Sequence, residues 1–139
     1  MKKLLYLFLA ITIISCGGDD DSGNTNNNIS NLTINPPSWI HGVYLQENID
    51  GSILPLGYEF KSDDFCTVLS NMATCYQAQL DLYGDTPNFE TDVYEESDSN
   101  RYFIELTIGV AIYEYEFEKV SSTIIRQILP TGENTYILQ

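Results

Sequence analysis

Two cysteines in the middle of the chain, Cys66 and Cys75, have the spacing most open to a chemical interpretation. Eight residues separate them, and the Cys-x-x-Cys spacing of redox catalysts is absent from the sequence. In an oxidising compartment an even pair of this kind predicts a disulfide, which in so short a loop stabilises a fold by at most about 3 kcal/mol. The alternative is a reactive thiolate, because Cys75 begins a predicted helix and a helix N-terminus acidifies a thiol. We expect the structural disulfide.

The other candidates for catalysis are a single histidine and many carboxylates. His41 is the one histidine, and a lone histidine beside Trp39 and Gly42 is more typical of a packing or surface residue than of a catalytic triad. Zinc is disfavoured, because one histidine and two oxidised cysteines cannot complete a tetrahedral site. The oxygen-rich turns lack the spacing of an EF-hand loop, and they contain Asp50, Asp63, Asp64, Glu95, Glu96 and Asp98. We therefore expect no enzyme, no cofactor and no metal site.

Aromatic side chains form the third group of interest. Seven of them fall in predicted strands, mostly on the faces expected to point inward: Tyr44, Tyr58, Phe60, Tyr102, Tyr113, Tyr115 and Phe117. A small barrel of about eight strands has an interior wide enough for side chains alone or for one small ligand. These aromatics therefore either fill the core or line a ligand cavity, and a ligand or water could supply the partners that buried phenols need.

The elements that must position these residues are mainly strands. Apolar and polar residues alternate most clearly along 111–119, where Tyr113, Tyr115 and Phe117 share one face and glutamates occupy the other. Such alternation indicates half-buried antiparallel strands. Further strands are predicted at 41–46, 56–60, 65–69, 89–95, 102–108, 123–129 and 135–138. About eight strands joined by short turns predict an all-β fold, a small antiparallel meander barrel, because closure removes exposed sheet edges.

One segment, 75–83, is predicted as a short helix. Thr74 and Gln77 have the spacing of a capping box, and Gly84 is placed to end the helix. A helix this short is not stable alone in water, so we expect it to pack on the sheet, across the open end of the barrel. The residues that would share its buried face are Tyr76, Leu80 and Tyr83.

The charge of the chain excludes some classes of partner. It has 20 acidic and 6 basic residues. Without Lys2 and Lys3, 4 basic residues remain against the 20 acidic ones, a formal charge of −16. So acidic a chain lacks the basic surface that nucleic acid requires, and it is repelled by anionic lipid. We expect no nucleic acid partner.

The N-terminus has the pattern of a lipoprotein signal peptide. Lys2 and Lys3 precede an apolar run of about eleven residues, shorter than the roughly 20 that span a bilayer. The run ends at Ser15-Cys16, and a small residue before a cysteine with branched aliphatics behind it resembles the lipobox of bacterial lipoproteins. This resemblance implies that residues 1–15 are removed and that Cys16 carries two or three acyl chains, enough for stable membrane anchoring.

An acidic run follows the cysteine, at Asp19, Asp20 and Asp21. It resembles the run beside the acylated cysteine in lipoproteins of the Bacteroidota, where it acts as an export signal. The resemblance implies an outer-membrane protein on the cell surface, with the periplasmic face as the alternative. The polar composition of 16–37 predicts a flexible tether, which leaves 38–139 as a single domain.

Two segments of that domain, 39–44 and 117–123, resemble short lipocalin-like lipoproteins of the Bacteroidota. Gly42-Val43-Tyr44 is similar to the lipocalin Gly-x-Trp motif, with tyrosine in place of tryptophan. The resemblance implies a small meander barrel on a lipid tether. We predict a non-enzymatic barrel that binds a small apolar or amphipathic ligand. The alternative is an accessory envelope lipoprotein with a solid core, acting by protein–protein contact.

Overall fold

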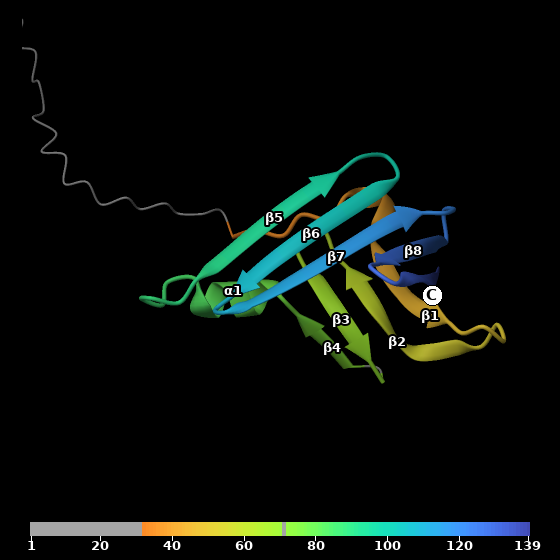
Figure 1. Ribbon diagram of the computed structural model, residues 1–139, viewed down its shortest axis with the longest axis horizontal. Coiled ribbons are helices and arrows are strands. Elements are labelled where there is room, and N and C mark those ends of the chain that lie inside the picture. The colour runs from red at the N-terminus through yellow and green to blue at the C-terminus, as the bar shows by residue number, and fades with distance from the viewer. Residues whose placement is uncertain (1–31, 71) are drawn as a thin grey trace, which may run out of the picture.

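The computed structural model of the protein describes residues 32–70 and 72–139. These residues form one antiparallel sheet of nine strands, with one short α-helix and one turn of 3-10 helix (Figure 1). In chain order the elements are η1 (Ser38–Ile40), β1 (Gly42–Glu47), β2 (Ile53–Phe60), β3 (Phe65–Leu69), β4 (Met72–Cys75), α1 (Gln77–Tyr83), β5 (Thr91–Ser97), β6 (Arg101–Ile108), β7 (Ala111–Lys119), β8 (Ile124–Leu129) and β9 (Gly132–Leu138).

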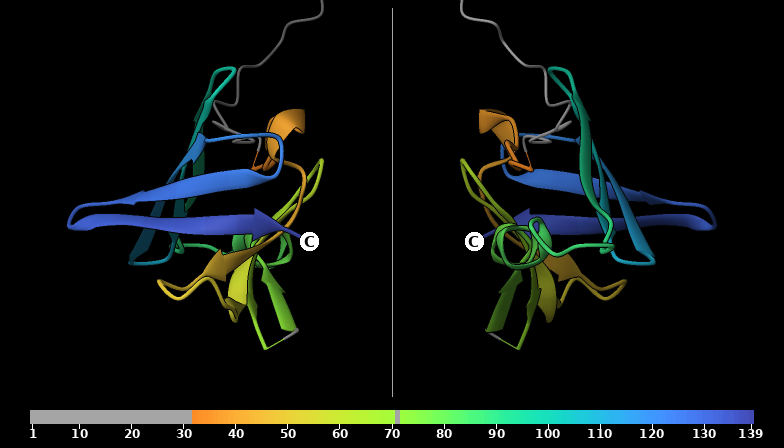
Figure 2. Two further views of the ribbon diagram at one scale, coloured as in Figure 1. Left: turned by 90° about the vertical axis from the view of Figure 1, so that its right-hand side faces the viewer. Right: turned by 90° about the vertical axis from the view of Figure 1, so that its left-hand side faces the viewer.

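The strands pair with their neighbours along the chain, except at one place. The order across the sheet is β4-β3-β2-β1-β9-β8-β7-β6-β5, so β1 pairs with β9, and β4 and β5 form the two edges. The sheet curls until its two halves face each other (Figures 1 and 2). The predicted antiparallel all-β barrel is confirmed as a curled half-barrel, which has nine strands and is open between β4 and β5.

The strand that the sequence did not predict is β4. Its four residues show no alternation of buried and exposed positions, because Met72, Ala73 and Thr74 are all exposed. It exists because it pairs with β3, placing Cys75 directly opposite Cys66. The predicted strands 65–69 and 111–119 have the observed bounds, whereas the strand predicted at 89–95 lies two residues later, at Thr91–Ser97.

Helix α1 begins two residues later than predicted, and its cap differs. The predicted capping box is wrong, because Tyr76 occupies the N-cap and no side chain in that position caps the helix. Instead, the Asp64 carboxylate accepts hydrogen bonds from the backbone N–H groups of Gln77, at 2.9 Å, and of Phe65, at 2.8 Å. Gly84 ends the helix as predicted. A carboxylate distant in sequence thus anchors the helix start to the β2–β3 turn.

The segment before η1 is packed against the domain. Residues 32–35, which we call the strap, run beside α1 and β5, and Ile34 is fully buried. The Gln77 side chain holds the strap at two points: its amide oxygen accepts from the Ile34 N–H at 3.0 Å, and its amide nitrogen donates to the Leu32 carbonyl at 2.7 Å. The folded domain therefore begins before residue 38 and includes 32–37, although the polar composition of this segment predicts a tether.

The core lies on the inner face of the curled sheet. Alternation along strands such as β6 and β8 places one row of side chains inside, as predicted, and the glutamates of β7 lie on the outer face. The fully buried side chains of this core include Tyr44, Phe60, Phe65, Tyr102, Ile104, Leu106, Phe117 and Ile125. Within residues 32–70 and 72–139, no helix is both long and apolar enough to cross a bilayer.

Candidate functional site

The deep part of the interior is filled by aromatic rings. Of the seven predicted interior aromatics, Tyr44, Phe60, Tyr102 and Phe117 are buried. The Phe60 ring lies edge-on to the Phe117 ring, with centroids 5.0 Å apart, and 6.1 Å from the ring of Tyr102. Rings of opposite halves of the sheet therefore pack directly on one another in the edge-to-face geometry that aromatic pairs favour. This part of the interior is core.

Toward one end of the inner face, tyrosines replace phenylalanines. Tyr58, Tyr113 and Tyr115, all predicted interior residues, gather there with Tyr136 of β9 and with Tyr76 of the predicted buried helix face. The Tyr58 ring lies 5.7 Å from Tyr115 and 5.1 Å from Tyr136, and Tyr76 lies 5.8 Å from Tyr113. We call these five residues the tyrosine cluster. They come from β2, β7, β9 and the turn before α1.

Four of the five cluster hydroxyls, those of Tyr58, Tyr76, Tyr115 and Tyr136, find partners within the protein. The Tyr76 and Tyr115 oxygens are 2.7 Å apart, and Tyr136 donates to the amide oxygen of Gln127 at 2.9 Å. Gln127 is the one buried polar residue of the described chain, and its side chain also forms a hydrogen bond with Tyr58. These hydroxyls therefore do not need a ligand or water as a hydrogen-bond partner.

Burial raises the pKa of four of these phenols. Desolvation is the largest cause that raises the pKa of Tyr58 and of Tyr76 far above its ordinary value. In Tyr76 the hydrogen bond with Tyr115 raises the pKa further. Burial also raises the pKa of Tyr115 and of Tyr136. Tyr58, Tyr76, Tyr115 and Tyr136 therefore present uncharged hydroxyls that can donate and accept hydrogen bonds throughout the physiological pH range.

Large apolar side chains extend the inner face beyond the cluster into solvent. Leu69 on β3 and Met72 on β4 are directly paired and lie at inner-face positions, where they are 61% and 68% exposed. Leu56 pairs with Leu69 from the other side. Tyr113, at the start of β7, is 40% exposed. We call Leu56, Leu69 and Met72 the apolar rim.

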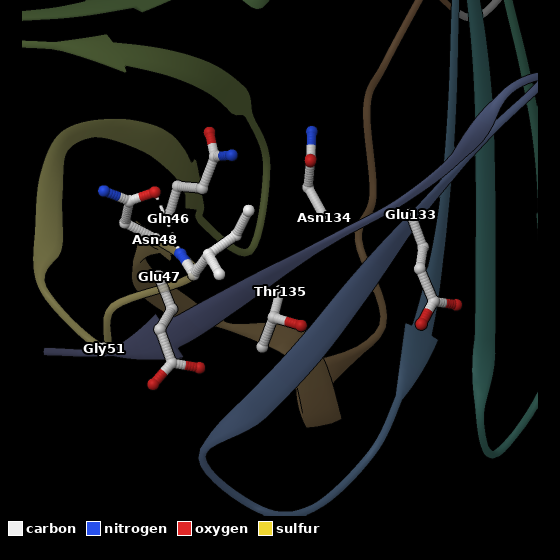
Figure 3. A pocket seen from close by; sticks show the side chains of 8 residues that line it. Gln46, Glu47, Asn48, Gly51, Glu133, Asn134 and Thr135 are labelled. Carbon is white, nitrogen blue, oxygen red and sulfur yellow. Dashed lines mark hydrogen bonds between the residues drawn. The ribbon is translucent and has the colours of Figure 1, made fainter.

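Amide side chains flank the cluster on its β1–β9 side. Gln46 pairs with Tyr136, and Asn134 pairs with Gln127, so both amides lie at inner-face positions. They border a surface hollow of about 530 Å³ (Figure 3). Figure 3 shows the amides of Gln46 and Asn134 on one side of the chain, and the carboxylates of Glu47 and Glu133 on the other.

The two charged residues at inner-face positions of the described strands lie away from the cluster. The Glu95 carboxylate accepts hydrogen bonds from the Asn35 backbone N–H, at 3.0 and 3.1 Å, and from the Tyr102 hydroxyl at 2.5 Å. Lys119, at the far end of β7 from Tyr113, lies over the Trp39 ring at 5.7 Å. Both charges are thus engaged by the residues that precede β1.

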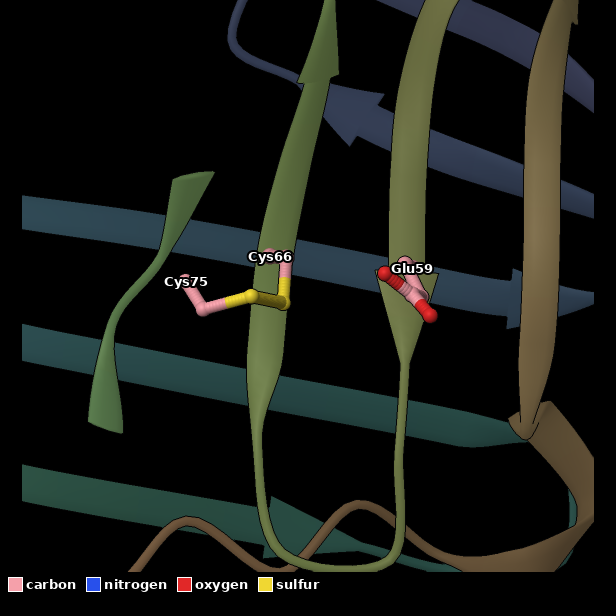
Figure 4. A group of neighbouring side chains, drawn as sticks. All are labelled: Glu59, Cys66 and Cys75. Carbon is pink, nitrogen blue, oxygen red and sulfur yellow. A yellow bond between two sulfur atoms is a disulfide. The ribbon is translucent and has the colours of Figure 1, made fainter. Parts of the chain in front are cut away.

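The predicted disulfide between Cys66 and Cys75 is present. The two residues face each other across β3 and β4 with Cα atoms 4.0 Å apart, and Glu59 occupies the neighbouring position on β2 (Figure 4). These three residues are close enough to resemble a metal-binding group. Because both sulfurs are consumed in the disulfide, only the carboxylate could act as a ligand. The reactive-thiolate alternative is excluded for this state of the protein.

The other residues considered for catalysis or metal binding have structural partners. The His41 ring nitrogen Nε2 lies 2.9 Å from the Pro36 carbonyl. Asp50 accepts from Ser52, and Asp98 accepts from the backbone N–H groups that follow it; these hydrogen bonds lower the pKa of each carboxyl. Asp63 and Glu96 are exposed. Glu96 and Asp98 line one surface hollow together with Arg101, whereas Asp50 and Asp63 lie in the β1–β2 and β2–β3 turns.

Three predicted site features, Cys16, the acidic run Asp19–Asp21 and most of the tether, lie outside the described residues. Comparisons of the chain with family models, with curated proteins and with solved structures find no match.

Sequence reasoning missed Tyr76, Tyr136 and Gln127 as members of the candidate site. A usable signal was present for Gln127, because it alternates with Ile125 and Leu129 and so occupies an inward position of its strand. Tyr76 belongs to the predicted buried face of the helix; it is buried, and its ring lies against those of Tyr113 and Tyr115.

Proposed function

We propose that this protein is a lipid-anchored, non-enzymatic binding protein of the bacterial outer membrane, exposed on the cell surface. The support for the anchor is the sequence pattern: a basic start, a short apolar run and a small residue before Cys16, followed by Asp19–Asp21. The domain then begins near residue 32 and holds its ligand away from the membrane surface.

A single observation carries the choice of binding surface. The tyrosine cluster and the apolar rim lie at one end of the inner face, where large apolar side chains remain exposed although the deeper interior is filled. Exposed apolar groups beside a few polar groups are typical of a surface that binds an amphipathic molecule. The ligand in this proposal lies across the open end of the half-barrel, in contact with Tyr113 and Met72.

The filled interior also favours a second function, that of an accessory lipoprotein acting by protein–protein contact. The surface available for such a contact includes a hollow of about 500 Å³ on the outer face of β1–β4. Its apolar lining contains Val43, Leu45, Val68 and Ala73. A protein partner would cover this hollow and leave the tyrosine cluster unchanged.

Ligand titration with matched variants separates the two functions. The mature chain carrying Cys16→Ala, which cannot be acylated, is examined by native mass spectrometry for copurifying molecules and then titrated with amphiphiles. Tyr113→Ser should weaken amphiphile binding about tenfold, because it removes an exposed ring from the contact. Ile112→Ser is the control, since the neighbouring Ile112 is exposed on the outer face. Equal effects of the two substitutions, or no binding at all, would reject the tyrosine cluster as the site.

The anchor is tested separately on intact cells. Cys16→Ala should abolish acyl labelling and release the protein from membranes, whereas unchanged labelling would refute lipidation at this residue. Replacement of Asp19–Asp21 by serine should protect the protein from added proteinase if these carboxylates direct surface export. Continued digestion of that variant would show that surface exposure does not depend on the acidic run.

A further inference from the structure

We propose that the ligand bound at the tyrosine cluster carries a neutral polar group rich in hydroxyls or amides, attached to an apolar portion. This inference rests on the proposed function, because it specifies the chemistry of the ligand at the same site. The ligand class is therefore a neutral amphiphile, such as an alkyl glycoside, and excludes fatty acids and alkylammonium ions.

The inner-face positions of the cluster carry no charge, and the carboxylates of Glu47 and Glu133 point to the other side of the chain from the flanking amides (Figure 3). The cluster's tyrosines, the apolar rim and the flanking amides Gln46, Gln127 and Asn134 are all uncharged side chains. The chain has 20 acidic residues, yet the carboxylates of β7 all lie on the outer face. Of the described inner-face positions, Glu95 and Lys119 are the charged ones, and each has a partner elsewhere.

A charged head group would be costly to bury at the cluster. An anionic group placed among these side chains would find no lysine or arginine in the cluster, and the net charge of the protein would repel it. A cation would be attracted to the protein as a whole, but in the cluster it would find no carboxylate. In both cases the ligand would lose water around a charge without gaining an opposite charge.

The cluster offers hydrogen bonds that a neutral polar group needs. Each phenol can donate one hydrogen bond and accept others, and the Tyr76–Tyr115 pair shares one hydroxyl hydrogen, which leaves the second hydroxyl hydrogen for another acceptor. The Asn134 amide donates one hydrogen bond to the Tyr136 hydroxyl, which leaves its second amide hydrogen and its carbonyl oxygen for a ligand. Rings such as Tyr113 supply flat apolar surface beside these groups, which suits a molecule with polar edges and an apolar face.

A series of probes with the same alkyl chain tests this inference. Octyl glucoside, octanoate and octylammonium differ in head group alone, and each is titrated calorimetrically, below its micelle concentration, into the mature Cys16→Ala chain. Octyl glucoside should bind about tenfold or more tightly than octanoate, because an unpaired charge is costly to desolvate. Octylammonium should bind weakly, with an affinity that falls as salt is added, as expected for attraction to the outer face.

Asn134→Asp converts one flanking amide into a carboxylate of the same shape. It should lower the affinity for octyl glucoside and raise that for octylammonium. Asn100→Asp is the matched control, because Asn100 lies exposed in the β5–β6 turn and its substitution adds the same charge outside the cluster. Octylammonium affinity should then rise with Asn134→Asp and not with Asn100→Asp.

The outcomes distinguish this inference from the function on which it rests. If octanoate binds as tightly as octyl glucoside and Tyr113→Ser weakens both, the site stands and the neutral-ligand inference is wrong. If none of the three probes binds, the proposed site is wrong and the inference fails with it. Preferential, Tyr113-dependent binding of octyl glucoside supports both.

Discussion

Single residues determine how closely the strands of this sheet can approach. Gly57 of β2 pairs with Leu45 of β1, and a Cβ atom added at Gly57 would lie 1.9 Å from the Tyr44 carbonyl oxygen. The clash is with backbone, so a side-chain rotation cannot relieve it. The pairing register of β1 and β2 shifts just beyond this point, between Leu45 and Glu47, which makes Gly57 a requirement of the local backbone path.

Gly57→Ala should therefore destabilise the domain by roughly 1–3 kcal/mol, because the two strands must separate to admit the methyl group. Chemical denaturation of the mature chain measures this loss. Gly51→Ala is the comparison, since Gly51 has open space around it and a φ of +80°; its cost should be that of a strained backbone, about 1 kcal/mol. An unchanged unfolding midpoint for Gly57→Ala would show that the strands are not in this contact.

The buried phenols predict a sensitivity to alkaline pH. Burial raises the pKa of Tyr58, Tyr76 and Tyr102 in the folded protein, while in the unfolded chain tyrosine titrates near 10. Since the unfolded state then loses its protons first, stability should be constant below about pH 10 and fall as the pH rises above it. Denaturant midpoints measured from pH 8 to 12 check this, and a constant midpoint across that range would contradict the burial of these hydroxyls.

Among the elements, the strap has the least expected role. It lies next to α1 and the edge strand β5. Its backbone N–H groups donate hydrogen bonds to the side chains of Gln77 in α1 and Glu95 in β5. The strap is thus part of the folded domain, with Ile34 in its core. Any displacement of the strap would uncover Ile34 and the Glu95 carboxylate together.

Ile34→Ala should cost about 2–5 kcal/mol of stability, the range for truncating a fully buried aliphatic side chain. Ile49→Ala, a chemically identical change at a fully exposed position in the β1–β2 turn, should alter stability by less than about 0.5 kcal/mol. Thermal or denaturant unfolding of both variants provides the comparison. Equal, negligible effects would mean that residues 32–35 do not pack on the domain.

The features of the fold that could be predicted from the sequence are those that depend on residues close together in the chain. Alternation along 111–119 defined a strand and its inner face, and the cysteine spacing led to the correct disulfide. The strap was not predictable, because Ile34 is surrounded in sequence by asparagine, threonine and proline, and its burial depends on Gln77 and Glu95, which lie 43 and 60 residues from the backbone groups they bind. The same holds for Asp64, whose capping of α1 replaced the local capping box.

For the molecule as a whole, the separation of charge is the main physical feature. A strongly acidic outer surface favours solubility and discourages contact with anionic membrane lipids, while the inner face around the tyrosine cluster is neutral. In the proposed arrangement the acyl chains at Cys16 supply the membrane attachment, and the open end of the half-barrel supplies recognition. Attachment and recognition would then be independent, and loss of one would leave the other intact.

The most direct test of a ligand at the tyrosine cluster uses the single methionine of the mature chain. Met1 is removed with the proposed signal peptide, which leaves Met72, an exposed member of the apolar rim, as the one methionine. Isotope labelling of its methyl group therefore yields a single NMR signal from the proposed site. Titration with octyl glucoside should shift this signal in a saturable manner, with the dissociation constant found by calorimetry. A Met72 signal that stays unmoved while calorimetry shows saturable binding would place the ligand elsewhere and contradict the account.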